Sequence, residues 1–244
     1  MKIYLDSDDI ATCYAFSNES AKTQQACEYG QLDSPKRRVQ EIAIDNMIGK
    51  LGEFAVKKFL AEHAIEIALD MNIYDYGQYD SCDFNYRGWT CDVKCTKSFG
   101  KHFLIEWNKL QFRADLNELP HYFVMTRLVD NSFLSNKKES LPSSICVELV
   151  GYCDIRALHE NNKNISIIDR GHFIPGTTTP LTAKSFCIPF KNLDKDWETF
   201  VKILKERTPF ELKNQIVTSL AHNSPEFEKT LPTTTNKGPK YSLL

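Results

Sequence analysis

Hydrophobic residues recur along the chain at two spacings, one typical of helices and the other of strands. From residue 47 the helical spacing is clear, and the wide apolar arc it creates is typical of a helix packed against a sheet. The members of this arc are Met47, Ile48, Leu51, Phe54, Ala55, Val56 and Phe59. Residues 65–69 form a short apolar run that predicts a strand after this helix.

An alternation of apolar and polar residues predicts a β-hairpin next. Residues 82–86 and 89–95 carry the alternating pattern, and Arg87-Gly88 between them is typical of a tight turn. The elements that follow are a strand at residues 103–107, a helix at 109–116 and a buried strand at 122–126. This order predicts an α/β sandwich with a central mixed β-sheet flanked by helices.

The 244 residues are expected to form one domain with additions. We expect a helical N-terminal extension over residues 1–46 and a core over residues 47–130. Strand-like runs predict a β-rich elaboration of the same domain over residues 131–225. Residues 226–244 carry threonine, proline and glycine in a pattern typical of a disordered tail.

Composition excludes several classes of protein. No apolar run approaches the roughly 18 residues of a membrane-spanning helix, and the N-terminus shows no secretory signal, so we expect a cytoplasmic protein without membrane contact. The eight cysteines lack the spacing of a zinc site. A net charge of −2 provides no broad basic surface, so any contact with nucleic acid must be local.

Two charged residues lie inside the second strand of the predicted hairpin. Side chains two positions apart in a strand share a face, so Asp92 and Lys94 are expected on one face, about 7 Å apart. The opposite face carries Cys91, Val93 and Cys95, which are small and apolar and suit a core. A carboxylate and an ammonium within a strand indicate a specific partner or task.

Pairing of the hairpin strands is expected to bring Asp83 beside Asp92. Two converging carboxylates repel unless a cation lies between them, and Mg²⁺ is a natural choice because it prefers oxygen ligands and retains water and substrate phosphate. Lys94 next to the ion can orient or deprotonate a water and stabilise charge on a phosphate. Asp83, Asp92 and Lys94 together therefore predict a metal-assisted site for phosphodiester hydrolysis.

A third carboxylate, Glu53, lies at the edge of the apolar arc of the preceding helix. Gly49 and Gly52 each cost about 1 kcal/mol relative to alanine in a helix interior. Both are expected where the helix must approach the sheet closely, which would bring Glu53 to the edge of the site.

The pattern of Glu53 between two glycines, then Asp83, then Asp92-Val93-Lys94 resembles the PD-(D/E)XK nuclease superfamily, which has the restriction-endonuclease-like fold. The resemblance implies that Asp83, Asp92 and the backbone carbonyl of Val93 ligate Mg²⁺, with Mn²⁺ as a substitute. It also implies that Lys94 acts on the attacking water and that Glu53 completes the acidic cluster. The resemblance covers roughly a third of the chain, and residues 1–46 and 131–244 lie outside it.

Two departures from the family motif stand in the chain. Cys82 occupies the place of the proline, and Asp80 is a rival to Asp83 as the first metal ligand.

Basic residues around the motif suit a phosphate backbone. The candidates for contact with nucleic acid are Lys97, Lys101, Lys109 and Arg113. For Lys97 and Lys101 taken singly, a solvated loop is the favoured alternative.

These observations predict a Mg²⁺-dependent endonuclease that hydrolyses DNA, and a role in restriction or anti-phage defence follows from family analogy alone. The alternatives are a structure-specific repair or recombination nuclease, a ribonuclease, and a non-catalytic nucleic-acid-binding subunit. An interpretation without any active site pairs Asp92 with Lys94, and Glu53 with Lys57, as plain ion pairs. Because two-strand cutting uses two sites, we expect a homodimer or a defence-system partner subunit.

Overall fold

The structure is a computed structural model that describes residues 1–26, 38–74, 82–115, 118–134, 141–158 and 162–210. Asp80 and the predicted tail 226–244 lie outside the described residues.

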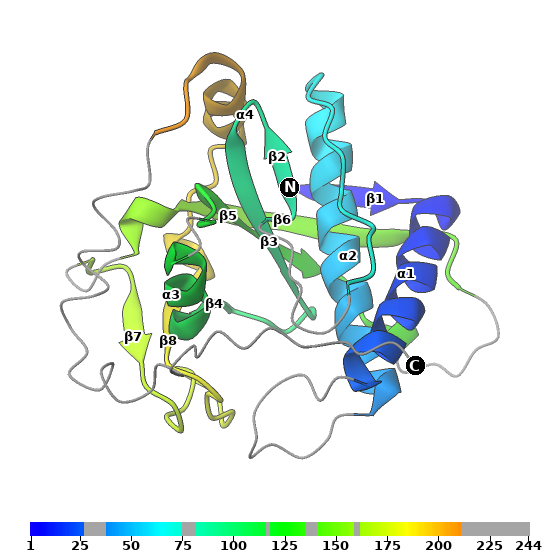
Figure 1. Cartoon of the computed structure of the whole chain (residues 1–244), viewed down its shortest axis with the longest axis horizontal. Coiled ribbons are helices and arrows are strands. Elements are labelled where there is room, and N and C mark those ends of the chain that lie inside the picture. The colour runs from blue at the N-terminus through cyan, green and yellow to red at the C-terminus, as the bar shows by residue number, and fades with distance from the viewer. Residues whose placement is uncertain (27–37, 75–81, 116–117, 135–140, 159–161, 211–244) are drawn as a thin grey trace, which may run out of the picture.

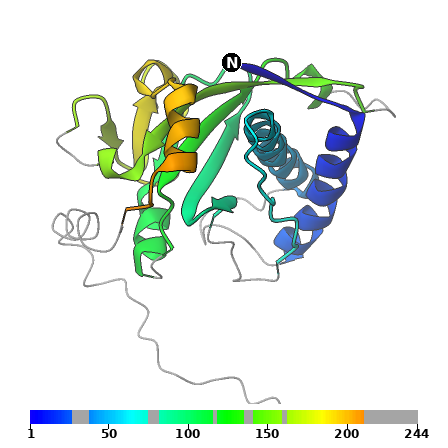
Figure 2. The same ribbon diagram turned by 90° about the horizontal axis from the view of Figure 1, so that it is seen from above.

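A curled, mixed five-stranded sheet forms the middle of the molecule (Figures 1 and 2). Its strands, in spatial order, are β1 (Lys2–Leu5), β6 (Ile145–Asp154), β5 (Tyr122–Leu128), β3 (Trp89–Thr96) and β2 (Phe84–Tyr86). The β3–β5 pair is parallel and the other pairs are antiparallel. The predicted α/β class with a mixed central sheet is therefore confirmed.

A second sheet of three strands lies on one side of the first (Figure 1). Its order is β4 (His102–Glu106), β8 (Ser185–Pro189) and β7 (Ser166–Ile168), and β4 leads directly into α3 (Trp107–Asp115). The strand predicted at residues 103–107 thus exists but belongs to this sheet and not to the central one. Phe103 and Ile105 on β4 are buried between the two sheets, which explains the alternating pattern.

Two long helices, α1 (Ser7–Ala26) and α2 (Val39–Glu62), cover the opposite side of the central sheet, as Figure 1 shows. A shorter helix, α4 (Trp197–Glu206), packs on the same side through Phe200, which contacts Tyr122 and Tyr152. The boundary predicted between residues 46 and 47 falls inside α2. Because β1 also pairs with β6, segments from the predicted extension and elaboration build one sheet with the predicted core.

The central sheet separates two hydrophobic cores. Cys91 and Val93 of β3 lie in the core shared with α1, α2 and α4. Phe123 and Met125, the partners of Asp92 and Lys94 on β5, lie in the core shared with α3 and the second sheet. The two faces of β3 therefore carry the residues that were predicted for them.

The hairpin β2–β3 turns at two residues in the left-handed region of backbone conformation. Arg87 has a φ of 50° and Gly88 a φ of 84°, as a two-residue turn that matches the twist of its strands requires. Residues 65–69, predicted as a strand, have no ladder partner among the described residues. Ile65 and Ile67 are buried there. Burial of every second residue gives the sequence the same alternation as a strand, although no strand forms.

The helix α2 comes close to the sheet at Gly52. A Cβ atom at this position would lie 2.5 Å from Thr126 Oγ1 and 2.7 Å from Cys95 Cβ, closer than non-bonded atoms pack. At Gly49, by contrast, a Cβ atom would meet no heavy atom of the described residues within 4 Å beyond its own helix and chain neighbours. The predicted close approach is confirmed for Gly52 and wrong for Gly49.

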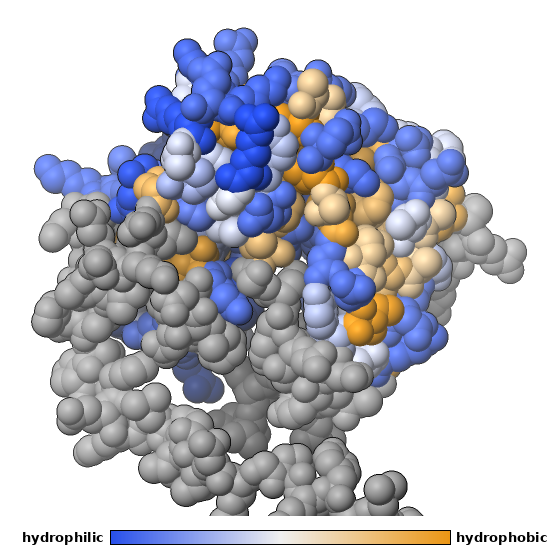
Figure 3. Space-filling view, turned by 45° about the horizontal axis from the view of Figure 1, so that its top comes forward, coloured by the Kyte–Doolittle hydropathy of each residue, from blue (hydrophilic) through white to orange (hydrophobic). Residues whose placement is uncertain are grey.

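Hydrophobic residues form separate patches among hydrophilic ones on the face drawn in Figure 3. Ile10 and Cys13 of α1, and Leu51 and Phe59 of α2, are buried in the core. Within the described part of the chain, no helix combines the length and the apolar composition needed to cross a membrane.

The two glycines of α2 give a matched pair of substitutions. We expect Gly52→Ala to lower the free energy of unfolding by about 1–3 kcal/mol, because Thr126 and Cys95 must move. Gly49→Ala is expected to raise it by about 0.5–1 kcal/mol, because alanine favours the helix and meets no neighbour. Urea denaturation of both variants measures the difference, and equal effects of the same sign would contradict the close approach.

Candidate active site

The carboxylate of Asp92 is the buried centre of the candidate site. It lies on β3 between the two sheets, and only 2% of its surface is exposed. Lys94, two residues along the same face, donates a hydrogen bond to Asp92 Oδ1 and keeps 43% of its side chain exposed. The pair is therefore more than a surface ion pair on a solvated face, because its acidic member is removed from water.

Arg113 supplies the second cation of the site. Its guanidinium reaches from α3 and donates to Asp92 Oδ2, so each carboxylate oxygen of Asp92 faces a different cation. Arg113, which was predicted to contact nucleic acid, thus has an ion-pair partner inside the protein. Sequence spacing could not reveal this contact, because it joins residues 21 positions apart through the packing of α3.

The electrostatics of the cluster follow from this geometry. Burial opposes the charged form of Asp92, but the attraction of Lys94 and Arg113 outweighs it and holds the pKa of the carboxyl below its usual value. Burial also opposes the charged form of Lys94, yet Asp92 and then Asp83 raise the pKa of its ammonium. Asp92 and Lys94 are therefore both charged at neutral pH.

Asp83 stands where the hairpin strands part. The ladder ends at Phe84 and Cys91, and Asp83 N–H donates to the Cys91 carbonyl at 3.0 Å just beyond it. Its carboxylate Oδ2 accepts a hydrogen bond from the Val93 N–H at 2.5 Å, in place of a strand partner. Asp83 therefore contacts the backbone of β3 on both sides of Asp92.

The Val93 carbonyl lies on the same edge as Asp83. In a strand, the N–H and C=O of one residue point to the same side, and the Val93 N–H points to Asp83. The carbonyl that the family resemblance implies as a metal ligand thus points to the same strand edge as Asp83.

Glu53 has a different neighbourhood from the one that was predicted. Its carboxylate accepts a hydrogen bond from Lys50 at 2.6 Å, and both side chains are buried. Lys50 also donates to the Asp70 carbonyl at 2.7 Å and lies over the ring of Phe16 in α1. The ion pair is with Lys50 instead of Lys57. It lies with α2 on the side of the sheet opposite to Asp92.

The donor set suits a hard cation only in part. Asp83, Asp92 and the Val93 carbonyl offer oxygen ligands, and Mg²⁺ is often held by one or two carboxylates while it keeps several waters. Among the described residues, no group of three His, Cys, Asp or Glu side chains could hold a metal ion together. A metal at Asp92 would also have to compete with Lys94 and Arg113 for the carboxylate oxygens.

The other basic residues predicted near the site lie on its periphery. Lys109 is exposed on α3 and lies 3.3 Å from Glu106. Lys97 is half-buried in the segment between β3 and β4, and Lys101 is exposed at its end. None of these three contacts Asp92 in the described structure.

Comparisons with protein-family models, with curated proteins and with solved structures give no match for this chain. Any functional interpretation therefore depends on the residues of the motif and on their geometry.

The Asp92–Arg113 ion pair predicts a pH-dependent contribution to stability. We expect Arg113→Met to lower the free energy of unfolding at neutral pH by about 1–3 kcal/mol, because the buried carboxylate loses one of its two cations. The folded-state pKa of Asp92 lies below the ordinary value of 3.8. The contribution is therefore present above pH 3.8 and is lost as the pH falls through the folded-state pKa.

Lys109→Met is the control for this substitution, because it removes an exposed cation from the same helix. An exposed ion pair contributes little, so its effect is expected to stay below about 0.5 kcal/mol. Chemical denaturation of both variants across the acidic range measures the effects. A loss in Arg113→Met that equals the loss in Lys109→Met would contradict a buried, paired Asp92.

Proposed function

We propose that this protein is a metal-dependent nuclease that hydrolyses DNA phosphodiester bonds at the Asp83–Asp92–Lys94 cluster. The observation that carries the proposal is a carboxylate buried between two sheets, paired with a partly exposed lysine side chain, and a second carboxylate at the adjoining open strand edge. The motif residues and their resemblance to the PD-(D/E)XK superfamily support it, as does the chain order α2, β2, β3, β4, α3, β5, in which β4 belongs to the second sheet. A restriction-endonuclease-like fold and a role in restriction or phage defence are parts of the same proposal.

Each residue has a distinct task in this proposal. Asp83 and Asp92 would hold Mg²⁺, which supplies Lewis-acid stabilisation of the phosphate and a polarised water. Lys94 carries a positive charge beside the site and is the exposed member, so it contacts the scissile phosphate and stabilises the charge that builds on it. Glu53, paired with Lys50, acts as a structural residue of α2 in this arrangement and not as a ligand.

Arg113 controls access to Asp92 in this proposal. Arg113 occupies Asp92 Oδ2 and Lys94 occupies Oδ1. A ligand that binds Asp92 must therefore displace one of these two cations. Once released, the guanidinium lies next to the site and can pair with a phosphate through two parallel hydrogen bonds.

The same ion pairs favour one alternative, a nucleic-acid-binding subunit without catalytic activity. Two cations that fully neutralise a buried carboxylate satisfy it without any metal. A protein of this kind would bind nucleic acid and leave it intact.

Cleavage assays test the proposed activity. We expect the wild type to cut supercoiled plasmid in Mg²⁺ or Mn²⁺ and not in EDTA, with single-stranded DNA and RNA as parallel substrates. Asp92→Asn and Lys94→Met are expected to lower the rate by roughly 10²-fold or more, since each removes a group that acts on the reacting phosphate. Lys202→Met is the control, because Lys202 is exposed on α4. Unchanged cleavage in the site variants, or binding without cleavage by the wild type, would reject the proposal.

Direct metal binding gives an independent test of the competition at Asp92. Arg113→Met is expected to bind Mn²⁺ more tightly than the wild type, because one oxygen of Asp92 is released. Asp92→Asn is expected to bind it more weakly, because a charged ligand is lost. Electron paramagnetic resonance of free Mn²⁺ measures both affinities, and weaker binding by Arg113→Met would argue against a metal at this carboxylate.

A further inference from the structure

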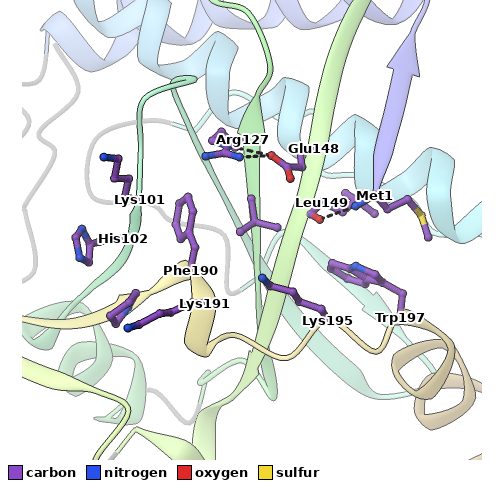
Figure 4. A pocket seen from close by; sticks show the side chains of 12 residues that line it. Met1, Lys101, His102, Arg127, Glu148, Leu149, Phe190, Lys191, Lys195 and Trp197 are labelled. Carbon is purple, nitrogen blue, oxygen red and sulfur yellow. Dashed lines mark hydrogen bonds and ion pairs between the residues drawn. The ribbon is translucent and has the colours of Figure 1, made fainter.

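A pocket of about 500 Å³ lies beside β6 and is lined by side chains from both of its faces (Figure 4). Its wall includes Arg127 from β5, Glu148 from β6, and the 3₁₀ helix η3 (Phe190–Asn192) that follows β8. We call it the basic pocket, because four lysine and arginine side chains line it against one carboxylate. The cations are Lys101, Arg127, Lys191 and Lys195, and the carboxylate is Glu148.

The charges of this pocket are not neutralised within the described structure. Glu148 is occupied by Arg127, whose Nε donates to it at 3.0 Å. No carboxylate of the described residues lies within 4 Å of the ammonium groups of Lys101, Lys191 or Lys195. Three uncompensated ammonium groups therefore share one pocket in a chain whose net charge is −2.

The nearby carboxylates of Asp194 and Asp196 form no ion pair with these lysines in the described structure, and both accept hydrogen bonds from backbone N–H groups. Asp194 accepts a hydrogen bond from the Asp196 N–H at 2.9 Å, and Asp196 caps α4 by accepting from Thr199 N–H at 3.0 Å. Figure 4 shows the labelled basic side chains arranged around Phe190, with Lys195 between Phe190 and Trp197. The pocket thus combines ammonium donors with aromatic surface.

We propose that the basic pocket binds a phosphate group, carried either by a small phosphorylated molecule such as a nucleotide or by a nucleic-acid backbone. A phosphate fits because its oxygens accept hydrogen bonds from several lysines at once and its charge offsets more than one of them. The volume lies in the range of small-molecule sites, and Phe190 and Trp197 provide apolar surface for the rest of the ligand.

The location of the pocket suits the nucleic-acid source as well. In the β3–β5 register, Thr96 pairs with Arg127 and Lys94 with Met125, so Arg127 lies two residues beyond Lys94 on the same face of the sheet. Arg127 also donates to the Gly100 carbonyl at 3.2 Å, which ties down the segment that links β3 to β4. Phosphate binding in this pocket requires no cleavage. A negative result in the cleavage assay therefore leaves this proposal intact.

Equilibrium binding in EDTA tests the site with three probes: pyrophosphate, AMP and a short single-stranded oligodeoxynucleotide. We expect calorimetric titration to detect binding that Lys191→Ala/Lys195→Ala weakens by roughly tenfold or more, since two charge-assisted contacts are lost. Lys202→Ala/Lys205→Ala removes the same charge from the exposed end of α4 and is expected to leave the affinity nearly unchanged. Circular dichroism verifies that each variant is folded.

A gain of affinity provides a second readout that misfolding cannot imitate. Glu148→Gln removes the single carboxylate of the pocket and frees Arg127, so we expect tighter binding of the same probe. Effects on pyrophosphate or AMP identify a small-molecule site, and effects confined to the oligonucleotide identify a backbone site. Absence of binding in the wild type, or equal losses in the two lysine pairs, would overturn the proposal.

Discussion

The burial of one carboxylate, that of Asp92, governs the arrangement of this side of the molecule. An isolated charge of this kind is costly in a protein interior unless it is paired and hydrogen-bonded. One cation, Lys94, comes from the same strand and needs only the alternation of side chains. The other, Arg113, comes from α3, so the helix and the strand β4 that leads into it must be placed correctly before the carboxylate is satisfied.

The two sides of the central sheet perform different physical tasks. The side covered by α1, α2 and α4 is a large apolar core, and the Gly52 contact sets how near α2 can come to it. The other side has a smaller core between the two sheets, and it carries Asp92, Lys94 and Arg127 of the two charged clusters. Chemistry and phosphate binding are thus proposed for the face that the long helices leave to the second sheet.

The two charged clusters differ in how they are balanced. At Asp92 the acidic groups and the cations compensate one another, so a ligand must displace an existing partner. In the basic pocket three ammonium groups lack a partner among the described residues, so an anion can bind without such a displacement. A metal at Asp92 therefore has to compete with Lys94 and Arg113, whereas an anion in the basic pocket meets no such competitor among the described residues.

The sequence by itself determined the local features. The apolar arc of α2, the turn at Arg87-Gly88 and the alternation along β3 depend on neighbours in the chain, and the structure has all three. The same alternation placed Asp92 and Lys94 on one face opposite Cys91 and Val93. Patterns that involve only residues close together in the chain follow from the periodicity of helices and strands, so they can be recognised in the sequence.

Only the tertiary structure decided which distant residues meet. It assigned Arg113 to Asp92 and Glu53 to Lys50, and it placed β4 in a second sheet. It also showed that Gly52 and not Gly49 makes the close contact, and it gathered Lys101, Arg127, Lys191 and Lys195 around one pocket. These contacts depend on how helices and sheets pack against one another. The pattern of polar and apolar residues along the chain does not specify which distant residues this packing brings together.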